Sequence, residues 1–298
     1  MINIKDLNNG IKYMLFASLM FAIMGAFAKI ASQSMSSIEV VFFRNVFGVL
    51  IIGYAVYKKP LKQVGGKPWL LFFRGFMGFS ALLAFFYNIA HIPLGEAMTY
   101  SKTSPIFTAL FAWLFLSERL SLKGWGAIGL GFIGIVFITQ PFGIGLSKYD
   151  LLGVASGVGA ALAYTSVREL KRYYDTRAIV LSFMLVGTVG PALLLMLSSL
   201  VAFDIDASYD VVLAPFVMPY GVTWVYLLAM GVTATLAQLY MTKAYGETKA
   251  GIVGTVSYSN IIFSIVIGLF LGDSFPSLVT TFGIVLIVVA GLLVARLK

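Results

Sequence analysis

The chain contains ten apolar segments, each long enough to cross a membrane as a helix. A membrane span needs about 20 residues, because each helical residue advances 1.5 Å. The approximate limits are 11–32, 38–57, 69–90, 93–115, 121–140, 149–171, 178–201, 220–243, 249–271 and 276–296. The first segment is too long for the apolar part of a signal peptide, so we expect it to be the first span. The sequence therefore predicts an all-α integral membrane protein with ten transmembrane helices.

The lysines and arginines lie almost entirely on one side of these segments. With a cytoplasmic N-terminus, sixteen of the 21 fall in cytoplasmic loops or termini, four lie inside spans, and only Lys148 faces the other side. Basic loops mark the cytoplasmic side of membrane proteins. We therefore expect a multi-pass protein of the inner (plasma) membrane with both termini in the cytoplasm. The net charge of +9 comes from these loops, so it does not indicate a nucleic-acid partner.

A short motif recurs at the ends of the fourth and ninth segments. The stretch Leu114–Arg119 (LFLSER) returns 155 residues later as Leu269–Ser274 (LFLGDS). A pair of glycines eight residues apart also occurs in both the fifth and the tenth segment. Five spans is an odd number, so the second copy must cross the membrane the other way up. Residues 1–145 and 146–298 are thus predicted to form two inverted five-helix repeats, an arrangement typical of secondary transporters.

Several functions are excluded or disfavoured by the residue inventory. The chain has no cysteine and one histidine, so it offers neither disulfides nor a His/Cys metal cluster. The stretch Gly124–Gly129 matches G-x-G-x-x-G, but that pattern binds dinucleotides only between a strand and a helix. Here it begins a membrane helix, where small residues let helices pack closely. We expect no metal ion and no cofactor.

Four basic residues lie inside spans. Arg74 lies near the end of its span, where a basic side chain reaches the headgroups, and Lys29 either does the same or has an internal role. Arg44 lies deeper, and we expect it either to form a structural or gate ion pair with Glu39 or to contact a solute. Lys102 lies near the middle of the fourth segment, where a cation costs about 2.5–3.5 kcal/mol to insert.

We assign Lys102 to a solute-binding cavity, because an intramembrane cation is functional by default. The alternative is a hydrogen bond to the carbonyls of a helix broken near Pro105. On a regular helix Thr99 and Thr103 share a polar stripe with Lys102, whereas Ser101 points the other way. Spans three, eight and nine are expected to wall the same cavity. The predicted solute-binding residues are Lys102, Tyr87, Asn88, Thr99, Thr103, Gln238, Ser257 and Tyr258.

The chain resembles a known family over essentially its whole length. The residues that carry the likeness are Leu114–Ile138, its partner Leu269–Val294, and Glu39–Asn45. They resemble the EamA-type, ten-span members of the drug/metabolite transporter superfamily. The Glu39–Asn45 stretch is similar to a subgroup that includes S-adenosylmethionine, organic-anion and amino-acid carriers. This chain departs from the family pattern after the ninth span, where an acidic-basic pair is replaced by Asp273-Ser274.

These observations favour a secondary transporter that works by alternating access. Deep bases without deep acids suit a solute with an anionic or zwitterionic group, such as an amino acid, an S-adenosylmethionine-like compound or a carboxylate. One alternative is an exporter of aromatic or amphipathic compounds, suggested by 25 phenylalanines and 15 tyrosines. An intramembrane enzyme is disfavoured, because Ser101 points away from Lys102 and no nucleophile–base contact follows. The expected partners are a small-molecule solute and the lipid bilayer, with the protein a monomer or homodimer.

Overall fold

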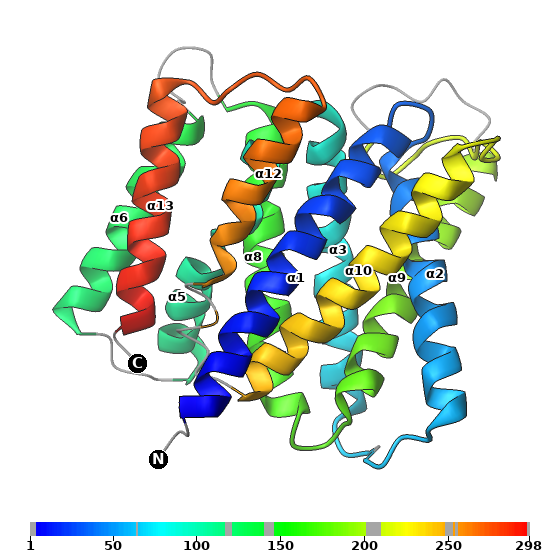
Figure 1. The fold of residues 1–298 in the computed structure, drawn as a ribbon, viewed down its shortest axis with the longest axis horizontal. Helices are drawn as coiled ribbons and strands as arrows, with labels where there is room; N and C mark the ends of the chain where they lie inside the picture. Colours follow the sequence, from blue (N-terminus) through cyan, green and yellow to red (C-terminus); the bar gives the residue numbers. More distant parts are fainter. Residues whose placement is uncertain are drawn as a thin grey trace.

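The computed structural model describes residues 4–63, 65–116, 121–139, 146–200, 210–247, 253 and 256–296. In this part of the chain the regular elements are all helices, as Figure 1 shows. The helices are α1 (Ile4–Ala31), α2 (Ser37–Lys58), α3 (Pro68–His91), α4 (Leu94–Ser101), α5 (Ser104–Leu116), α6 (Leu122–Thr139), α8 (Lys148–Leu170), α9 (Thr176–Leu200), α10 (Thr223–Glu247), α12 (Ser259–Phe270) and α13 (Leu278–Arg296).

The ten predicted spans correspond to these helices. Among the described residues, six helices are long and apolar enough to cross a membrane: α1, α2, α3, α8, α9 and α10. The fourth span is broken into α4 and α5, and the fifth, ninth and tenth spans contain the shorter helices α6, α12 and α13. The fold class, an all-α integral membrane protein, is confirmed. The repeated motif residues 117–119 lie outside the described residues.

Local sequence signals explain where several helices begin. Ser36 precedes α2 and forms a capping box with Glu39, and Ser147 does the same for α8 with Asp150. In each box the serine accepts a backbone N–H and the acid accepts the N–H of the serine. Pro68 occupies the first turn of α3, where its missing N–H has no helical partner to lose.

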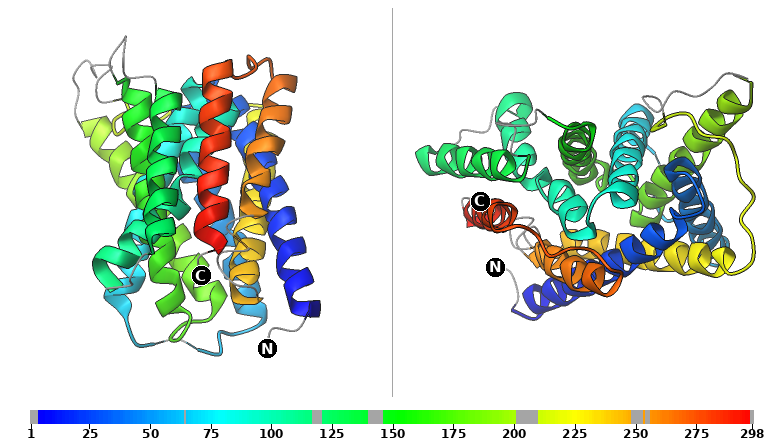
Figure 2. Two further views of the ribbon diagram at one scale, coloured as in Figure 1. Left: turned by 90° about the vertical axis from the view of Figure 1, so that its left-hand side faces the viewer. Right: turned by 90° about the horizontal axis from the view of Figure 1, so that it is seen from above.

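The helices pack in pairs that are distant in sequence. The main pairs are α1 with α10, α3 with α8, α2 with α9, and α6 with α13. If each span is replaced by the span five positions away in the chain, the α1–α10 pair becomes the α8–α3 pair. The α2–α9 and α6–α13 pairs each map onto themselves. This is the pairing that two equivalent halves produce, although the inversion of the two halves remains a prediction. Figure 2 shows α6 and α13 side by side at the edge of the bundle, where Gly134 and Gly283 face each other.

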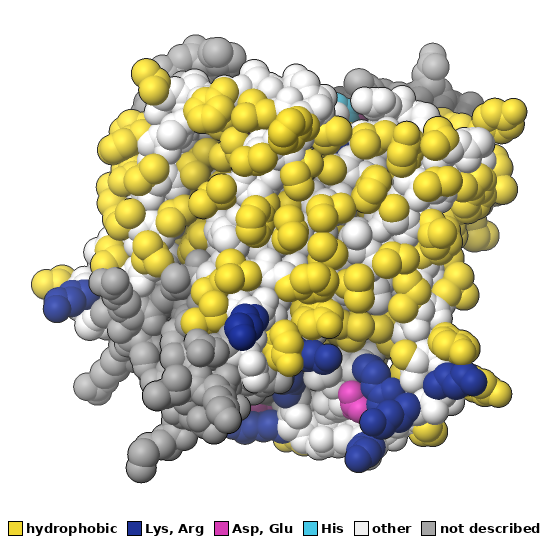
Figure 3. All heavy atoms as spheres, in the orientation of Figure 1, with side chains coloured by type: hydrophobic (Ala, Val, Ile, Leu, Met, Phe, Trp, Pro, Cys, Tyr) yellow, Lys and Arg dark blue, Asp and Glu magenta, His cyan; other side chains and the backbone are white. Residues whose placement is uncertain are grey.

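The two ends of the bundle differ in charge. The first turn of α1 and the last turn of α13 lie at the same end (Figure 1). Lysine and arginine side chains gather at that end, and a broad apolar surface extends above them (Figure 3). We call this the terminal end and the opposite one the far end. An apolar surface of this breadth needs lipid around it, which agrees with a multi-pass membrane protein.

Candidate functional site

A cavity lies inside the bundle, among the helices that form its core. Its walls come from eight of the ten spans, more than the four that the sequence suggested, and only the α6–α13 pair takes no part. The lining residues are Phe21, Met24, Arg44, Arg74, Gly78, Ala81, Leu82, Phe85, Met98, Ser101, Lys102, Ser156, Ala160, Ala163, Tyr164, Phe183, Gln238 and Asn260.

Three bases line this cavity, and none of its described lining residues is an Asp or Glu. Arg44 comes from α2, Arg74 from α3, and Lys102 from the break between α4 and α5. Arg44 and Arg74 are almost fully buried, with 1% and 3% of their surface exposed. A buried charge without a partner costs several kcal/mol, so a cavity of this composition favours an anionic ligand.

Arg44 is held in place by its neighbour Asn45. The Nη1 of Arg44 donates to Oδ1 of Asn45 at 2.7 Å. Asn45 in turn donates to the carbonyls of Val41 and Gly187, at 2.8 and 3.0 Å. Gly187 belongs to α9, and a Cβ there would lie 2.7 Å from Nδ2 of Asn45. This close approach of α2 and α9 therefore fixes the direction of the Arg44 guanidinium.

Arg74 makes no hydrogen bond to any described residue. Its Nε and Nη1 are buried without a partner, as is Nε of Arg44. Both guanidiniums converge on the ring of Phe183, with Cζ of Arg74 at 4.3 Å and Cζ of Arg44 at 5.4 Å from its centroid. From its position in the sequence, Arg74 was expected to reach the headgroups. That expectation is corrected, because distance from a helix end does not tell which way a side chain faces.

Lys102 sits at the break in the fourth span. Helix α4 ends at Ser101, and the backbone N–H of Lys102 caps it by donating to Met98 and Thr99. The Lys102 ammonium lies 5.9 Å from the ring centroid of Phe21 and donates no hydrogen bond to any described residue. Because the helix stops here, Ser101 lines the cavity beside Lys102. The expectation that Ser101 points away is thus corrected, since it assumed an unbroken helix.

The cavity lining also includes polar, uncharged groups. Asn260 donates to the carbonyl of Ser18 at 2.8 Å, and its Oδ1 is buried without a partner. Gln238 from α10 is 4% exposed and lines the same space. Tyr164 from α8 also lines the cavity. Amide oxygens of this kind accept hydrogen bonds from a solute's ammonium or hydroxyl groups.

The structure places only Lys102 and Gln238, of the eight predicted solute-binding residues, on the cavity wall. Tyr87 donates to Asp210 at 2.7 Å, and Asn88 donates to the carbonyl of Tyr149 at 2.9 Å. Both therefore tie the far end of α3 to neighbouring segments. Their partners are distant in sequence, so the pattern of residues along α3 gave no sign of them.

The other predicted residues pack between helices. Thr99 and Thr103 donate to carbonyls of their own chain segment, at Gly95 and Tyr100, each at 2.7 Å. Ser257 and Tyr258 are buried away from the cavity lining, and the Tyr258 phenol lies over Gly291 of α13.

Glu39 and Arg44 do not form an ion pair. The Glu39 carboxylate accepts from Ser36 and from the backbone N–H of Val217 at 2.6 Å, so it ties the start of α2 to the segment before α10. Arg44 lies more than one turn further along and faces the cavity. This corrects the expected gate or structural pair, because the capping box had already engaged Glu39.

The far end of the bundle is closed by polar contacts between helices. Lys29 of α1 forms an ion pair with Asp273, just after α12, and also donates to the carbonyl of Ile92 at 3.2 Å. Asp273 also accepts the backbone N–H of Leu94 at 2.9 Å. Tyr100 donates to Asp150 at 2.5 Å. Of the two roles expected for Lys29, the internal one is therefore observed. Lys29 supplies the basic partner of Asp273.

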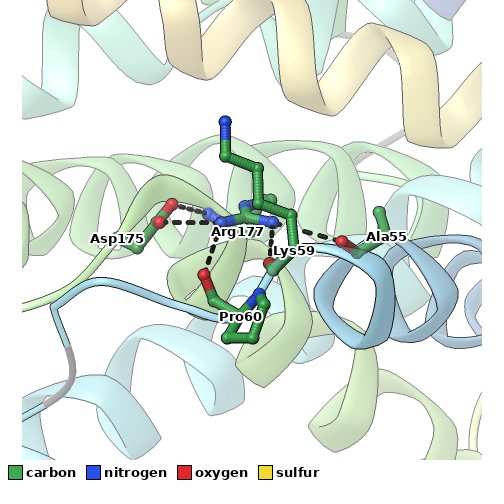
Figure 4. Close-up of polar contacts among 5 residues, drawn as sticks. All are labelled: Ala55, Lys59, Pro60, Asp175 and Arg177. Atoms are coloured by element: carbon green, nitrogen blue, oxygen red, sulfur yellow. Dashed lines mark hydrogen bonds and ion pairs between the residues drawn. The ribbon is translucent and has the colours of Figure 1, made fainter.

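The terminal end is joined by a different set of contacts. Arg177 donates to the carbonyls of Ala55, Lys59 and Pro60 and pairs with Asp175, as Figure 4 shows. Lys67 pairs with Glu169 at 2.9 Å, which raises the pKa of Lys67 and holds the pKa of Glu169 below its usual value. These contacts fix the loops between α2 and α3 and between α8 and α9.

An apolar bundle of helices with a polar, basic cavity among them is typical of a membrane transporter. Comparison with known proteins agrees. The chain belongs to the EamA-like transporter family, whose model matches residues 8–140, and this confirms the resemblance seen in the sequence. It is 35% identical to an uncharacterized transporter of Helicobacter pylori, over 96% of this chain and 94% of that protein.

Other relatives are named for their solutes. The chain is 35% identical to the pseudopaline exporter CntI of Pseudomonas aeruginosa, over 98% of both chains. It is 22% identical to an S-adenosylmethionine uptake transporter of Rickettsia prowazekii, over 98% of this chain and 94% of that one. A protein of known crystal structure shares the fold, with a TM-score of 0.64 at 18% identity over 96% of both chains.

Proposed function

We propose that this protein is a secondary transporter for a small organic solute that carries an anionic group, alone or as part of a zwitterion. The observation that carries the proposal is the cavity charge: Arg44, Arg74 and Lys102 line it, and none of its described lining residues is acidic. Cations buried at this depth are stabilised by a bound anion that replaces their lost hydration. Amino acids, carboxylates and S-adenosylmethionine-like compounds fit this charge.

Two further features suggest that the solute carries hydrogen-bond donors or an aromatic part in addition to its anionic group. The free Oδ1 of Asn260 accepts a hydrogen bond and suits an ammonium or hydroxyl group. Phe21, Phe85 and Phe183 give the cavity aromatic walls. Those rings also favour a second candidate, export of an aromatic or amphipathic compound, provided that this compound is anionic. The relatives named for pseudopaline and S-adenosylmethionine are consistent with a polar organic solute.

Alternating access gives the two ends of the bundle their roles. The Lys29–Asp273 ion pair must break for solute to pass the far end, and the Arg177 and Lys67 contacts hold the terminal end. The positively charged terminal end would face the cytoplasm of the inner membrane. The cavity is complete within one chain, so a monomer suffices for transport and a homodimer would carry two independent sites.

A thermal-shift screen of the purified protein tests the proposed charge class. A ligand that binds the folded state raises its stability by RT ln(1 + [L]/Kd). We expect organic acids and amino acids to raise the melting temperature of the wild type and to lose this effect in Lys102→Met. Lys123→Met, which removes an exposed lysine at the start of α6, is the matched control and should respond as the wild type does. If organic amines without an acid group stabilise the protein and no acid does, the proposal is wrong.

A further inference from the structure

The three bases of the cavity form two separate groups. Arg44 and Arg74 converge on one ring, that of Phe183. Lys102 lies over a different ring, that of Phe21 in α1. The cavity thus has a guanidinium pair on the α2–α3–α9 side and an ammonium on the α1–α4 side.

The guanidinium pair has the properties of a binding site for one oxyanion group. Three of its nitrogen atoms, Nε of Arg44 and Nε and Nη1 of Arg74, are buried without a hydrogen-bond partner. Two like charges near one another in a site of low dielectric repel each other, and no described acid of the cavity neutralises them. The planar fork of a guanidinium matches the two oxygens of a carboxylate or the oxygens of a phosphate.

Lys102 offers a different kind of contact. Its ammonium is a compact charge with three donors, and it makes no hydrogen bond to a described residue. It sits where the helix is interrupted, with Ser101 beside it. Broken helices near the membrane midplane commonly hold the charged groups of transported solutes. This second position suits one further anionic group of the same solute.

We propose that the cavity contains two anion subsites, the Arg44–Arg74 pair and Lys102, and that the transported solute carries an anionic group for each. This inference rests on the proposed function, because it concerns the number of anionic groups on a solute already taken to be anionic. The arginine pair holds a planar oxyanion in a fixed orientation. Lys102 holds the second group, and the neutral oxygen of Asn260 is available to a donor between them.

Matched pairs of probes measure the number of subsites. The probes are the α,ω-dicarboxylates from succinate to suberate, each compared with its own monomethyl ester, which keeps the length and removes one charge. Affinity is measured by calorimetric titration of the purified full-length protein. We expect at least one dicarboxylate to bind roughly tenfold or more tightly than its monoester, because a charge-assisted hydrogen bond contributes about that factor.

Single substitutions then assign the subsites. In Arg74→Gln and in Lys102→Met only one subsite remains, so the ratio of diacid to monoester affinity should fall to near one in each. The matched controls Arg172→Gln and Lys123→Met change exposed bases away from the cavity and should keep the wild-type ratio. Arg44→Gln tests the same subsite as Arg74→Gln and replaces it if that variant does not fold.

Each result decides between the alternatives. A ratio near one in the wild type, with the carboxylates still bound, overturns the two-subsite inference and leaves the proposed function intact. A ratio that survives in Lys102→Met overturns the assignment of the second group to Lys102. If none of the carboxylates or monoesters binds, the proposed function itself fails.

Discussion

Lys29 and Asp273 form an ion pair that joins the end of α1 to the end of α12. Both side chains are mostly buried, at 20% and 12% exposure, and Asp273 also accepts the backbone N–H of Leu94 at the start of α4. Three helices therefore meet at one carboxylate. This contact is the point at which we expect the far end of the bundle to open.

The first prediction concerns that ion pair. Asp273→Asn keeps an acceptor for Leu94 but removes the charge that pairs with Lys29, so the closed far end should lose about 1–3 kcal/mol. The chain has no cysteine, so spin labels can be attached specifically at Gln33→Cys and Ser274→Cys. Double electron–electron resonance then measures the distance between the two labels across this end. We expect longer distances in Asp273→Asn. Lys123→Gln, at an exposed position of α6, is the control, and an unchanged distribution in Asp273→Asn would refute the gate.

The second prediction concerns the contact between α2 and α9. A Cβ at Gly187 would lie 2.7 Å from the Asn45 amide, so Gly187→Ala should cost about 1–3 kcal/mol through overpacking. It should also weaken anion binding, because Asn45 orients Arg44. Gly129→Ala is the matched control: nothing lies within 4 Å of its Cβ, and alanine is expected to stabilise the helix slightly. Equal melting temperatures for the two variants would contradict this account.

The third prediction concerns Arg177 at the terminal end. Arg177→Ala leaves the carbonyls of Ala55, Lys59 and Pro60 without their donor, so we expect a loss of about 1.5–3 kcal/mol in unfolding free energy. Arg172, whose side chain is 75% exposed, provides the control, and Arg172→Ala should change the stability very little. Thermal unfolding in detergent compares the two, and similar losses would argue against the role of this network.

The fourth prediction concerns pH. Burial acts to raise the pKa of Asp210, but hydrogen bonds from Lys148 and Tyr87 prevail and hold that pKa below its usual value. A depressed carboxyl pKa stabilises the fold above the unfolded value, about 3.9, and the effect is lost as pH falls toward the folded value. The wild type should therefore be more stable than Asp210→Asn near neutral pH, and the difference should shrink below about pH 4. Melting curves between pH 3 and pH 7 test this, and a constant difference would contradict it.

The fifth prediction concerns topology. The basic terminal end should lie in the cytoplasm, because positive loops are retained there. Green fluorescent protein fused after Lys298 should be fluorescent, and alkaline phosphatase at the same position should be inactive. Active phosphatase would reverse the orientation. The same fusions in the connection at Ser34, at the far end, should give the opposite pair of results.

The spans and the fold class could be predicted from the sequence, because each depends on local composition. An apolar segment that spans the bilayer forms a helix, because its backbone N–H and C=O groups must pair within the segment. The break in the helix after Ser101 was harder to predict, although Pro105 indicated it. Because of this break, Thr99 and Thr103 do not share one polar helix face with Lys102 as expected. Helix periodicity predicts which residues share a face only while the helix is continuous.

Residue roles that depend on tertiary contacts could not be predicted in this way. Arg74 was assigned to the headgroups from its depth, yet it turns inward to Phe183 of α9, more than 100 residues away. Tyr87 was assigned to the cavity from its residue type, yet Asp210 binds its hydroxyl group. Both outcomes depend on which helices become neighbours, and one sequence does not contain that information in a local pattern.

The bases of the cavity are unevenly distributed along the chain. Arg44, Arg74 and Lys102 all precede residue 103, whereas the lining residues Tyr164, Phe183, Gln238 and Asn260 follow residue 163 and are uncharged.

The formal charge of the site therefore moves with one part of the chain. When that part shifts along the membrane normal, it carries three positive charges through the membrane potential, at about 2.3 kcal/mol per charge for each 100 mV crossed. A rearrangement that moves this site across the potential is therefore voltage-dependent. Each negative charge on a bound solute reduces the charge moved by one elementary charge.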